Sequence, residues 1–183
     1  MSRRRSRAKA TSLEAAQVID VLRRKIAYLS GGLDIRGGPV ITFPGQNPTL
    51  PEPPPAEVAA CLQYLASIPS AEYAAKGFTI VIDNRQGYWR EPSVLFDIIQ
   101  QCLNGNVHSV FVVRADQIFD AQRLDLSFRK GKVQTSFKPQ VVPLARLQRH
   151  IPTDQMTADF GGTLPYRHDL WLKNRLSLEK YIK

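Results

Sequence analysis

Long apolar runs are missing from this chain, so the sequence contains no candidate for a membrane-spanning helix. The two most apolar stretches, Phe78 to Ile82 and Val110 to Val113, are far too short to cross a bilayer. The first residues carry the positive charge of a signal peptide without the apolar stretch that must follow, which argues against secretion and leaves a mitochondrial presequence open. At 183 residues, 43% of them hydrophobic, the chain suits one globular domain with a sizeable core.

Cysteine and histidine are scarce, and neither occurs at a spacing typical of a metal site. Cys61 and Cys102 fall in predicted helices among apolar neighbours, which favours two buried thiols in a reducing compartment over a disulfide or a metal site. The three histidines are scattered and unpaired. Neither a nucleophile elbow, a Cys/His dyad nor a phosphate-binding glycine loop is present, and the glycine pairs are better explained as helix ends and turns. We therefore expect no enzymatic activity and no cofactor.

Asp83 is the one acidic residue whose position invites comparison with a catalytic group. It ends a predicted strand, where α/β proteins place functional side chains. No base or nucleophile accompanies it in the sequence. A structural acid that fixes the following loop is therefore at least as well supported as a catalytic one.

Acidic residues are absent before Glu14, whereas five basic residues precede it. Residues 1–11 are therefore predicted to be a disordered basic arm, with the folded domain over residues 12–183. The net charge is +9, and the chain beyond the arm keeps 20 basic against 16 acidic residues. Such an arm can contact nucleic acid or anionic lipid, and charge alone does not distinguish the two.

The middle of the chain predicts a βαβ unit. Phe78–Asp83 and Val107–Val113 are apolar, β-rich runs typical of buried strands, and a helix that begins at Pro92 separates them. Two strands joined by a helix at this separation lie parallel with a right-handed crossover. The fold class expected from these runs is α/β, with a mostly parallel sheet and helices around it.

The other elements follow from apolar spacing and from glycine and proline breaks. Val18, Leu22, Ile26 and Leu29 recur every four residues and predict a helix capped by Ser12 and stopped at Gly31-Gly32. In chain order, the remaining predictions are a strand over 40–43, helices over 56–66 and 71–76, a helix over 117–126, strands over 133–137 and 140–142, and helices over 144–150, 154–160 and 169–182.

The segment from Arg114 to Lys132 interleaves large apolar residues with basic ones. Its apolar members are Ile118, Phe119, Leu124, Leu126 and Phe128, and its basic members are Arg114, Arg123, Arg129, Lys130 and Lys132. Apolar contact combined with cationic contact would suit a lipid with an anionic head group. The alternative is an ordinary amphipathic surface helix, and the pattern alone favours that alternative.

Several long blocks, in order, resemble a known family. They are Tyr28-Leu-Ser-Gly-Gly, Arg36-Gly-Gly-Pro-Val-Ile-Thr-Phe-Pro, Tyr64-Leu-Ala-Ser-Ile-Pro-Ser, Gly77-Phe-Thr-Ile-Val-Ile-Asp, Trp89, and Asp154-Gln-Met-Thr-Ala-Asp-Phe-Gly-Gly-Thr-Leu-Pro-Tyr-Arg-His-Asp-Leu-Trp. They are similar to CRAL-TRIO domains of Rho exchange factors such as Trio, kalirin, Dbs and puratrophin, and of the related protein with spectrin repeats. The resemblance covers about residues 22–178.

The resemblance implies a mostly parallel mixed sheet with flanking helices and a gate helix, within residues 115–129, over an apolar pocket. Ile118, Phe119, Leu124 and Phe128 would then line the pocket or gate, while Arg114, Arg123, Arg129, Lys130 and Lys132 would contact the head group or membrane. The gate segment is shorter and more polar than in lipid-transfer members of the family, and the helical lobe before the pocket is reduced to one helix and the arm.

By the same resemblance, the function is non-catalytic phospholipid binding, of phosphoinositide in particular, with cytoplasmic localisation and peripheral membrane association. A bound phospholipid, an anionic membrane and, through a longer chain, Rho-family signalling proteins are the implied partners. The alternative is a protein-interaction or autoinhibitory module with no bound lipid. Nucleic acid is disfavoured, because the aromatic and basic interleaving of RNA-binding sheets is missing.

Overall fold

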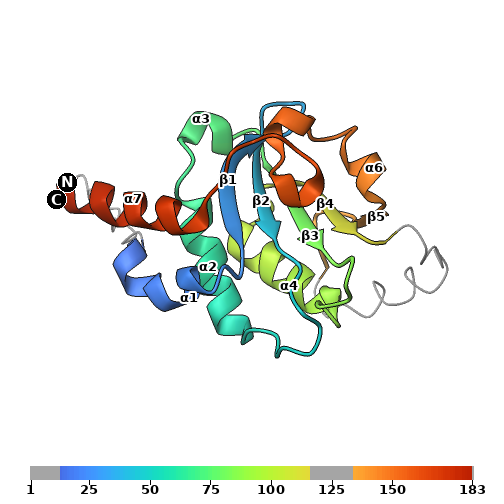
Figure 1. The fold of residues 1–183 in the computed structure, drawn as a ribbon, viewed down its shortest axis with the longest axis horizontal. Coiled ribbons are helices and arrows are strands. Elements are labelled where there is room, and N and C mark those ends of the chain that lie inside the picture. The colour runs from blue at the N-terminus through green and yellow to red at the C-terminus, as the bar shows by residue number, and fades with distance from the viewer. Residues whose placement is uncertain (1–12, 116–133, 183) are drawn as a thin grey trace, which may run out of the picture.

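One mixed five-stranded sheet organises the chain (Figure 1). The computed structural model describes residues 13–115 and 134–182. The strands are β1 (Tyr28–Leu33), β2 (Pro39–Phe43), β3 (Phe78–Asp83), β4 (Val107–Val113) and β5 (Gln140–Val142), and they neighbour one another in that order. β1 pairs antiparallel with β2, and the other three pairings are parallel. The predicted α/β class with a mostly parallel mixed sheet is confirmed.

Helices α2 (Pro55–Ala66) and α4 (Pro92–Leu103) cover one face of the sheet. Each begins with a proline in its first turn, where the missing N–H costs no intrahelical hydrogen bond. Their apolar stripes pack on alternate residues of the strands, among them Ile41, Ile80 and Val110, which are fully buried. This layer holds the larger of the two hydrophobic clusters, and it contains the predicted βαβ unit β3–α4–β4.

Short elements from the C-terminal third cover the opposite face. They are α6 (Leu144–Leu147) and the 3₁₀ turns η2 (Thr153–Gln155) and η3 (Ala158–Phe160). Leu147, Ile151, Met156 and Phe160 pack against the other set of alternate strand residues, which includes Val81. Among the described residues this second cluster is the smaller one, and irregular turns bury less apolar surface than a full helix does.

The predicted first helix is wrong in its second half. The chain forms η1 (Ala15–Val18) and α1 (Ile19–Arg23), after which Lys25 adopts a left-handed conformation with φ of 51°. Residues from Tyr28 onward then pair with β2, so Gly31-Gly32 lie in strand β1 instead of ending a helix. Val18, Leu22, Ile26 and Leu29 are all buried as the spacing predicted, but the last two lie beyond the helix.

Other predicted elements also need correction. Residues 154–160 form η2 and η3 instead of one helix. The described part of the predicted strand 133–137 is irregular, because Ser136 donates its N–H to the side chain of Gln100 on α4 (2.7 Å) instead of joining the sheet. Helix α3 (Ala71–Ala74) and α6 are shorter than predicted. The predicted helix over 117–126 lies outside the described residues.

The last helix, α7 (His168–Tyr181), packs beside η1 and α1 (Figure 1). Glu179 on α7 accepts the Ala15 N–H (2.7 Å) and the Tyr64 hydroxyl (2.8 Å), and Arg175 donates to the same hydroxyl (3.0 Å). Burial raises the pKa of Tyr64 to about 12, so this hydroxyl keeps its proton at neutral pH. These bonds join the two ends of the described chain to α2.

Candidate functional site

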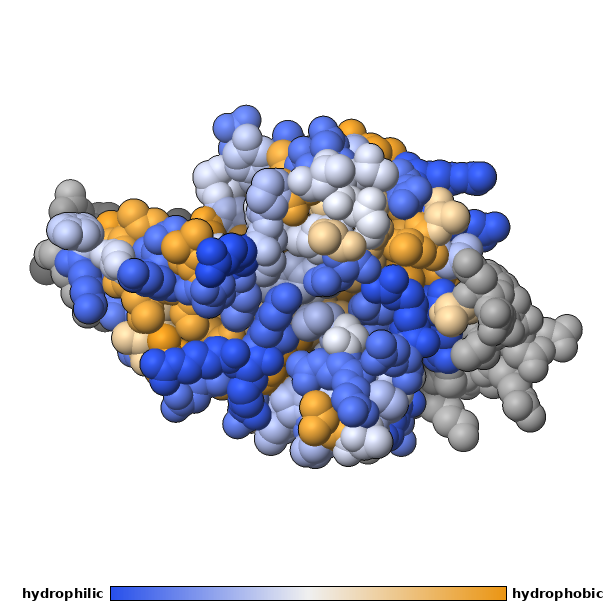
Figure 2. Space-filling model, viewed as in Figure 1, coloured by the Kyte–Doolittle hydropathy of each residue, from blue (hydrophilic) through white to orange (hydrophobic). Residues whose placement is uncertain are grey.

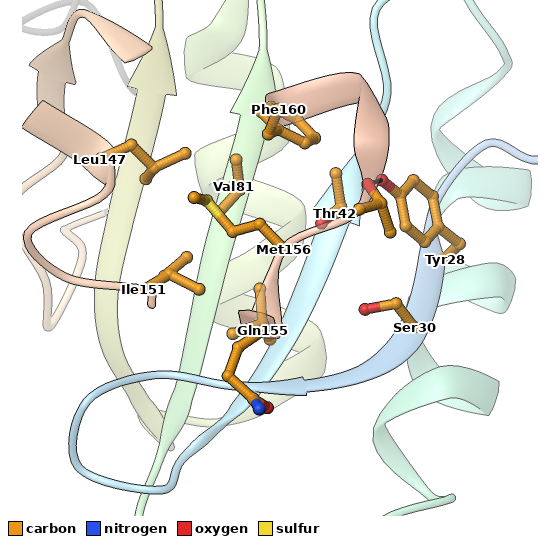
Figure 3. A pocket seen from close by; sticks show the side chains of 11 residues that line it. Tyr28, Ser30, Thr42, Val81, Leu147, Ile151, Gln155, Met156 and Phe160 are labelled. Atoms are coloured by element: carbon orange, nitrogen blue, oxygen red, sulfur yellow. Dashed lines mark hydrogen bonds between the residues drawn. The ribbon is translucent and has the colours of Figure 1, made fainter. Parts of the chain in front are cut away.

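The face of the sheet under the C-terminal turns carries the second hydrophobic cluster and a small cavity. Tyr28, Ser30, Thr42 and Val81 present their side chains from β1, β2 and β3, and residues 147–160 cover them (Figure 3). Ring and thioether groups from the cover meet these strand residues across the layer. The described residues therefore supply both the floor and one wall of the site.

This part of the site is packed almost closed. The cavity between floor and wall measures about 10 Å³, which is room for no more than about one water molecule. A hydrogen bond between the Tyr28 hydroxyl and Thr157 Oγ1 (3.0 Å) crosses it, and burial raises the pKa of Tyr28 to about 12. Ligand pockets usually measure about 300 Å³ or more. The floor and wall alone thus leave no space for an acyl chain.

Two glycines bring the covering turns this close. A Cβ on Gly32 would lie 2.1 Å from the carbonyl oxygen of Gln155, and one on Gly162 would lie 1.9 Å from that of Met156. Only hydrogen fits at either place. The cover is pinned further by the Leu33 N–H, which donates to Gln155 Oε1 (3.0 Å). Gly32 thus lets the wall lie close against the sheet, and Gly162 lets the covering segment fold tightly on itself, roles that the sequence did not reveal.

Arg114 is the one predicted site residue within the described part of the chain. It follows β4 directly, and its backbone N–H donates to Val142 of β5 (3.1 Å). Its side chain is half-buried, burial lowers its pKa, and its Nε finds no hydrogen-bond acceptor in the described chain. The buried Nε thus lacks a partner among the described residues. The head-group contact predicted for Arg114 stays a prediction.

The other predicted site residues lie outside the described residues. They are Ile118, Phe119, Leu124 and Phe128 for the pocket or gate, and Arg123, Arg129, Lys130 and Lys132 for the head group. The gate helix and its position over the pocket therefore stay predictions.

Asp83 is a structural acid. Its carboxylate accepts two hydrogen bonds from the guanidinium of Arg85, at 2.9 and 2.8 Å, and one from the Arg85 backbone N–H at 3.2 Å. This fixes the loop after β3, as one of the two sequence interpretations expected. The hydrogen bonds to the Asp83 carboxylate also raise the pKa of Arg85.

The described residues offer neither a metal site nor an activated thiol. Within 13–115 and 134–182, no group of three His, Cys, Asp or Glu side chains is placed to hold a metal ion. No helix there is both long enough and apolar enough to cross a bilayer. Cys61 and Cys102 are free, and burial raises the pKa of both thiols, to about 11 for Cys61, so neither is an activated nucleophile at neutral pH.

Known proteins match nearly the whole chain. Residues 37–169 match the family model described as "Divergent CRAL/TRIO domain". The human SEC14 domain and spectrin repeat-containing protein 1 is 36% identical over 171 residues, which is 93% of this chain and 24% of that protein. The rat guanine nucleotide exchange factor DBS is 36% identical over 170 residues, covering 91% of this chain and 15% of that protein. The chain thus spans a quarter or less of these relatives.

The family match spans most of the candidate site, but not strand β1, which contributes Tyr28 and Ser30 to the floor. It begins in the turn before β2 and continues through the parallel strands and the covering turns to the first residues of α7. Domains of this family are generally non-catalytic modules of a lipid-binding type. The chain belongs to the divergent CRAL/TRIO domain family.

Proposed function

We propose that this chain is a non-catalytic module that binds anionic phospholipid, phosphoinositide in particular. Through it, a longer protein would associate peripherally with membranes on the cytoplasmic side and regulate Rho-family signalling. Family membership over residues 37–169 is the observation that carries the proposal. The name of one relative, a guanine nucleotide exchange factor, supports the signalling context.

The physical properties of the chain agree with a membrane ligand. The net charge is +9, and five of these charges precede residue 10. Each basic residue near an anionic membrane contributes about 1 kcal/mol, so this segment supplies at most about 5 kcal/mol, and less at high salt. Burial of about fifteen methylenes in a pocket would contribute on the order of 12 kcal/mol before entropic costs. A lipid held in a pocket would therefore resist salt, whereas surface attraction would not.

A second candidate function is a protein-interaction or autoinhibitory module that holds no lipid. The observation that favours it is the cavity of about 10 Å³ between the floor and the C-terminal wall, which is closed by Tyr28, Thr157 and Phe160. In that case the gate segment would pack onto this face as ordinary core.

Phe119→Asp distinguishes the two functions. If Phe119 faces a bound lipid, the carboxylate meets an acyl chain without a partner, at a cost of several kcal/mol, and lipid retention should be lost while the fold persists. If Phe119 packs in a closed core, the melting temperature should instead fall sharply.

Native mass spectrometry and thermal unfolding on one preparation read out both effects. Lipid carried by the wild type and lost from Phe119→Asp, at an unchanged melting temperature, supports the lipid module. Absence of lipid from the wild type together with a large fall in the melting temperature of the variant supports the interaction module.

A further inference from the structure

An open cleft of about 520 Å³ lies where β2 and β3 end, beside the packed site but separate from it. Four segments line it: the end of α1 with Arg24 and Lys25, residues 44–46 after β2, the loop after β3, and residues 159–160. The carboxyl ends of parallel strands are where open α/β sheets place ligands. On the face seen in Figure 2, the surface over these strand ends is mostly hydrophilic. The cleft therefore suits a polar ligand of small-molecule size.

Arg85 is held rigidly at one side of the cleft. Its Nε and one terminal nitrogen, Nη2, bond the Asp83 carboxylate, and Nη2 also donates to the carbonyl of Asp159 (2.8 Å). The guanidinium lies over the Phe160 ring, 5.1 Å from its centroid. Nη1 makes no hydrogen bond within residues 13–115 and 134–182. A fixed guanidinium with one nitrogen to spare is a preorganised donor for an anion.

Lys25 supplies a second cation from a residue with an unusual backbone conformation. Its φ of 51° is left-handed, a conformation that costs a non-glycine residue about 1 kcal/mol. Its ammonium lies 4.7 Å from the centroid of the Tyr28 ring and 5.6 Å from that of Tyr166. No carboxylate of the described chain forms an ion pair with it, whereas Arg24 next to it pairs with Glu57. Lys25 is thus a positive charge in the cleft that lacks an anion.

The remaining polar groups of the cleft suit hydroxyls. Gln46 and Gln86 carry amides that donate and accept, and Asp159 carries a carboxylate that accepts. A phosphorylated polyol carries both kinds of group that this lining suits. Its phosphate would pair with Lys25 and Arg85, and its hydroxyls would bond the two amides and the Asp159 carboxylate. A carboxylate in the lining also disfavours a bare polyanion, because like charges repel.

Acyl chains have no entrance from this cleft. Phe160 lines both the cleft and the cavity of about 10 Å³ beside it, so its ring forms the wall between them. We propose that the cleft binds the phosphorylated polyol head group of a lipid whose acyl chains stay in the bilayer. This deepens the proposed function, on which it rests, by naming a head-group site, and it is independent of any lipid held in an apolar pocket.

Lys25→Asn tests the proposal, because asparagine tolerates a left-handed φ and the substitution removes the ammonium. Lys76→Asn is the matched control. The Lys76 ammonium also lies near a tyrosine ring, 5.4 Å from the centroid of Tyr73, but Lys76 precedes the start of β3, whereas the cleft lies where β3 ends. One arm titrates each protein with glycerophosphoinositol 4-phosphate, the deacylated head group. The other measures binding to phosphatidylcholine vesicles with and without phosphatidylinositol 4-phosphate.

The expected result is that Lys25→Asn weakens both interactions about tenfold, the effect of one lost charge-assisted hydrogen bond, while Lys76→Asn does not. Equal vesicle binding by the two variants would overturn the proposal that the cleft binds the head group, and would leave the proposed function standing. Vesicle binding by the wild type without any response to the soluble head group would also overturn it. Binding of the soluble head group through Lys25, without vesicle binding, would support the cleft for a free polyol phosphate and overturn the proposed function.

Discussion

His168 is the residue whose protonation the fold controls most directly. Its Nε2 lies 2.6 Å from the carbonyl oxygen of Leu22, and its Nδ1 lies 2.7 Å from the Tyr166 hydroxyl. A carbonyl can only accept, so Nε2 carries the proton and Nδ1 accepts from the tyrosine. The ring also stacks on Trp171, 5.6 Å between centroids. The neutral imidazole therefore satisfies every contact at the start of α7.

Stability should consequently fall as the pH falls through the range in which histidine titrates. Burial foremost, and then the charge of Lys25, lowers the pKa of His168 below that of an unfolded chain, which is about 6.5. The unfolded state then binds the proton more readily, so the stabilisation is present above the unfolded pKa and is lost below it. Chemical unfolding from pH 7 to pH 5 should show this loss, reduced in His168→Gln. An NMR titration that gives His168 a pKa above the unfolded value would contradict it.

At the scale of elements, β1 is the strand that decides how the C-terminal turns sit. It is irregular, with a register shift between Leu29 and Leu33, and Gly32 within it touches the carbonyl of Gln155. The contact and the Leu33 N–H bond together hold η2 against the sheet. A small residue in the strand therefore determines the depth of the covering wall.

Gly32→Ala should reduce the free energy of unfolding by about 3 kcal/mol, because a backbone carbonyl cannot move aside as a side chain can. Gly87→Ala is the control for glycine loss alone: Gly87 has a φ of 73° and a Cβ added to it would meet no atom within 4 Å, so only the left-handed strain of about 1 kcal/mol applies. Urea unfolding of both variants compares the two costs. A smaller loss in Gly32→Ala than in Gly87→Ala would show that the wall is not pinned there.

The sequence predicted those elements whose evidence is local. β3, β4, α2 and α4 combine an apolar pattern with a proline or glycine boundary, and all four form where expected. The stretch from Ile26 to Leu33 was predicted incorrectly because its apolar residues are buried in either conformation. Pairing with β2 selected the strand, and that partner is distant from the pattern that a helix prediction uses.

Prediction of the candidate site was likewise limited to residues that are neighbours in the sequence. The interleaved pattern between 114 and 132 is visible in the sequence, and it directed the head-group prediction there. Lys25 and Arg85 are far apart in the chain. They line one cleft only because the segments that follow α1 and β3 meet there in the fold. Arg85, two residues after Asp83, was the one available hint. Neither the left-handed φ of Lys25 nor its ring contacts leave a trace in the sequence.

The molecule as a whole combines the fold of a lipid-binding family with a basic surface and a nearly closed cavity beneath the C-terminal turns. In the proposed function, the basic residues before Glu14 would add attraction to an anionic membrane that requires no pocket. The proposed site at the ends of β2 and β3 would add recognition of a head group. Together these features predict a protein that binds the surface of an anionic membrane and distinguishes its head groups.

Flotation of the whole chain with vesicles tests this most directly. The protein should float with phosphatidylcholine vesicles that contain phosphatidylinositol 4-phosphate, and far less with phosphatidylcholine alone. Removal of residues 1–11 should weaken this binding and flatten its salt dependence, since five cations contribute at most about 5 kcal/mol by attraction that salt screens. Equal binding to both kinds of vesicle, or binding to neither, would contradict membrane recognition by this chain.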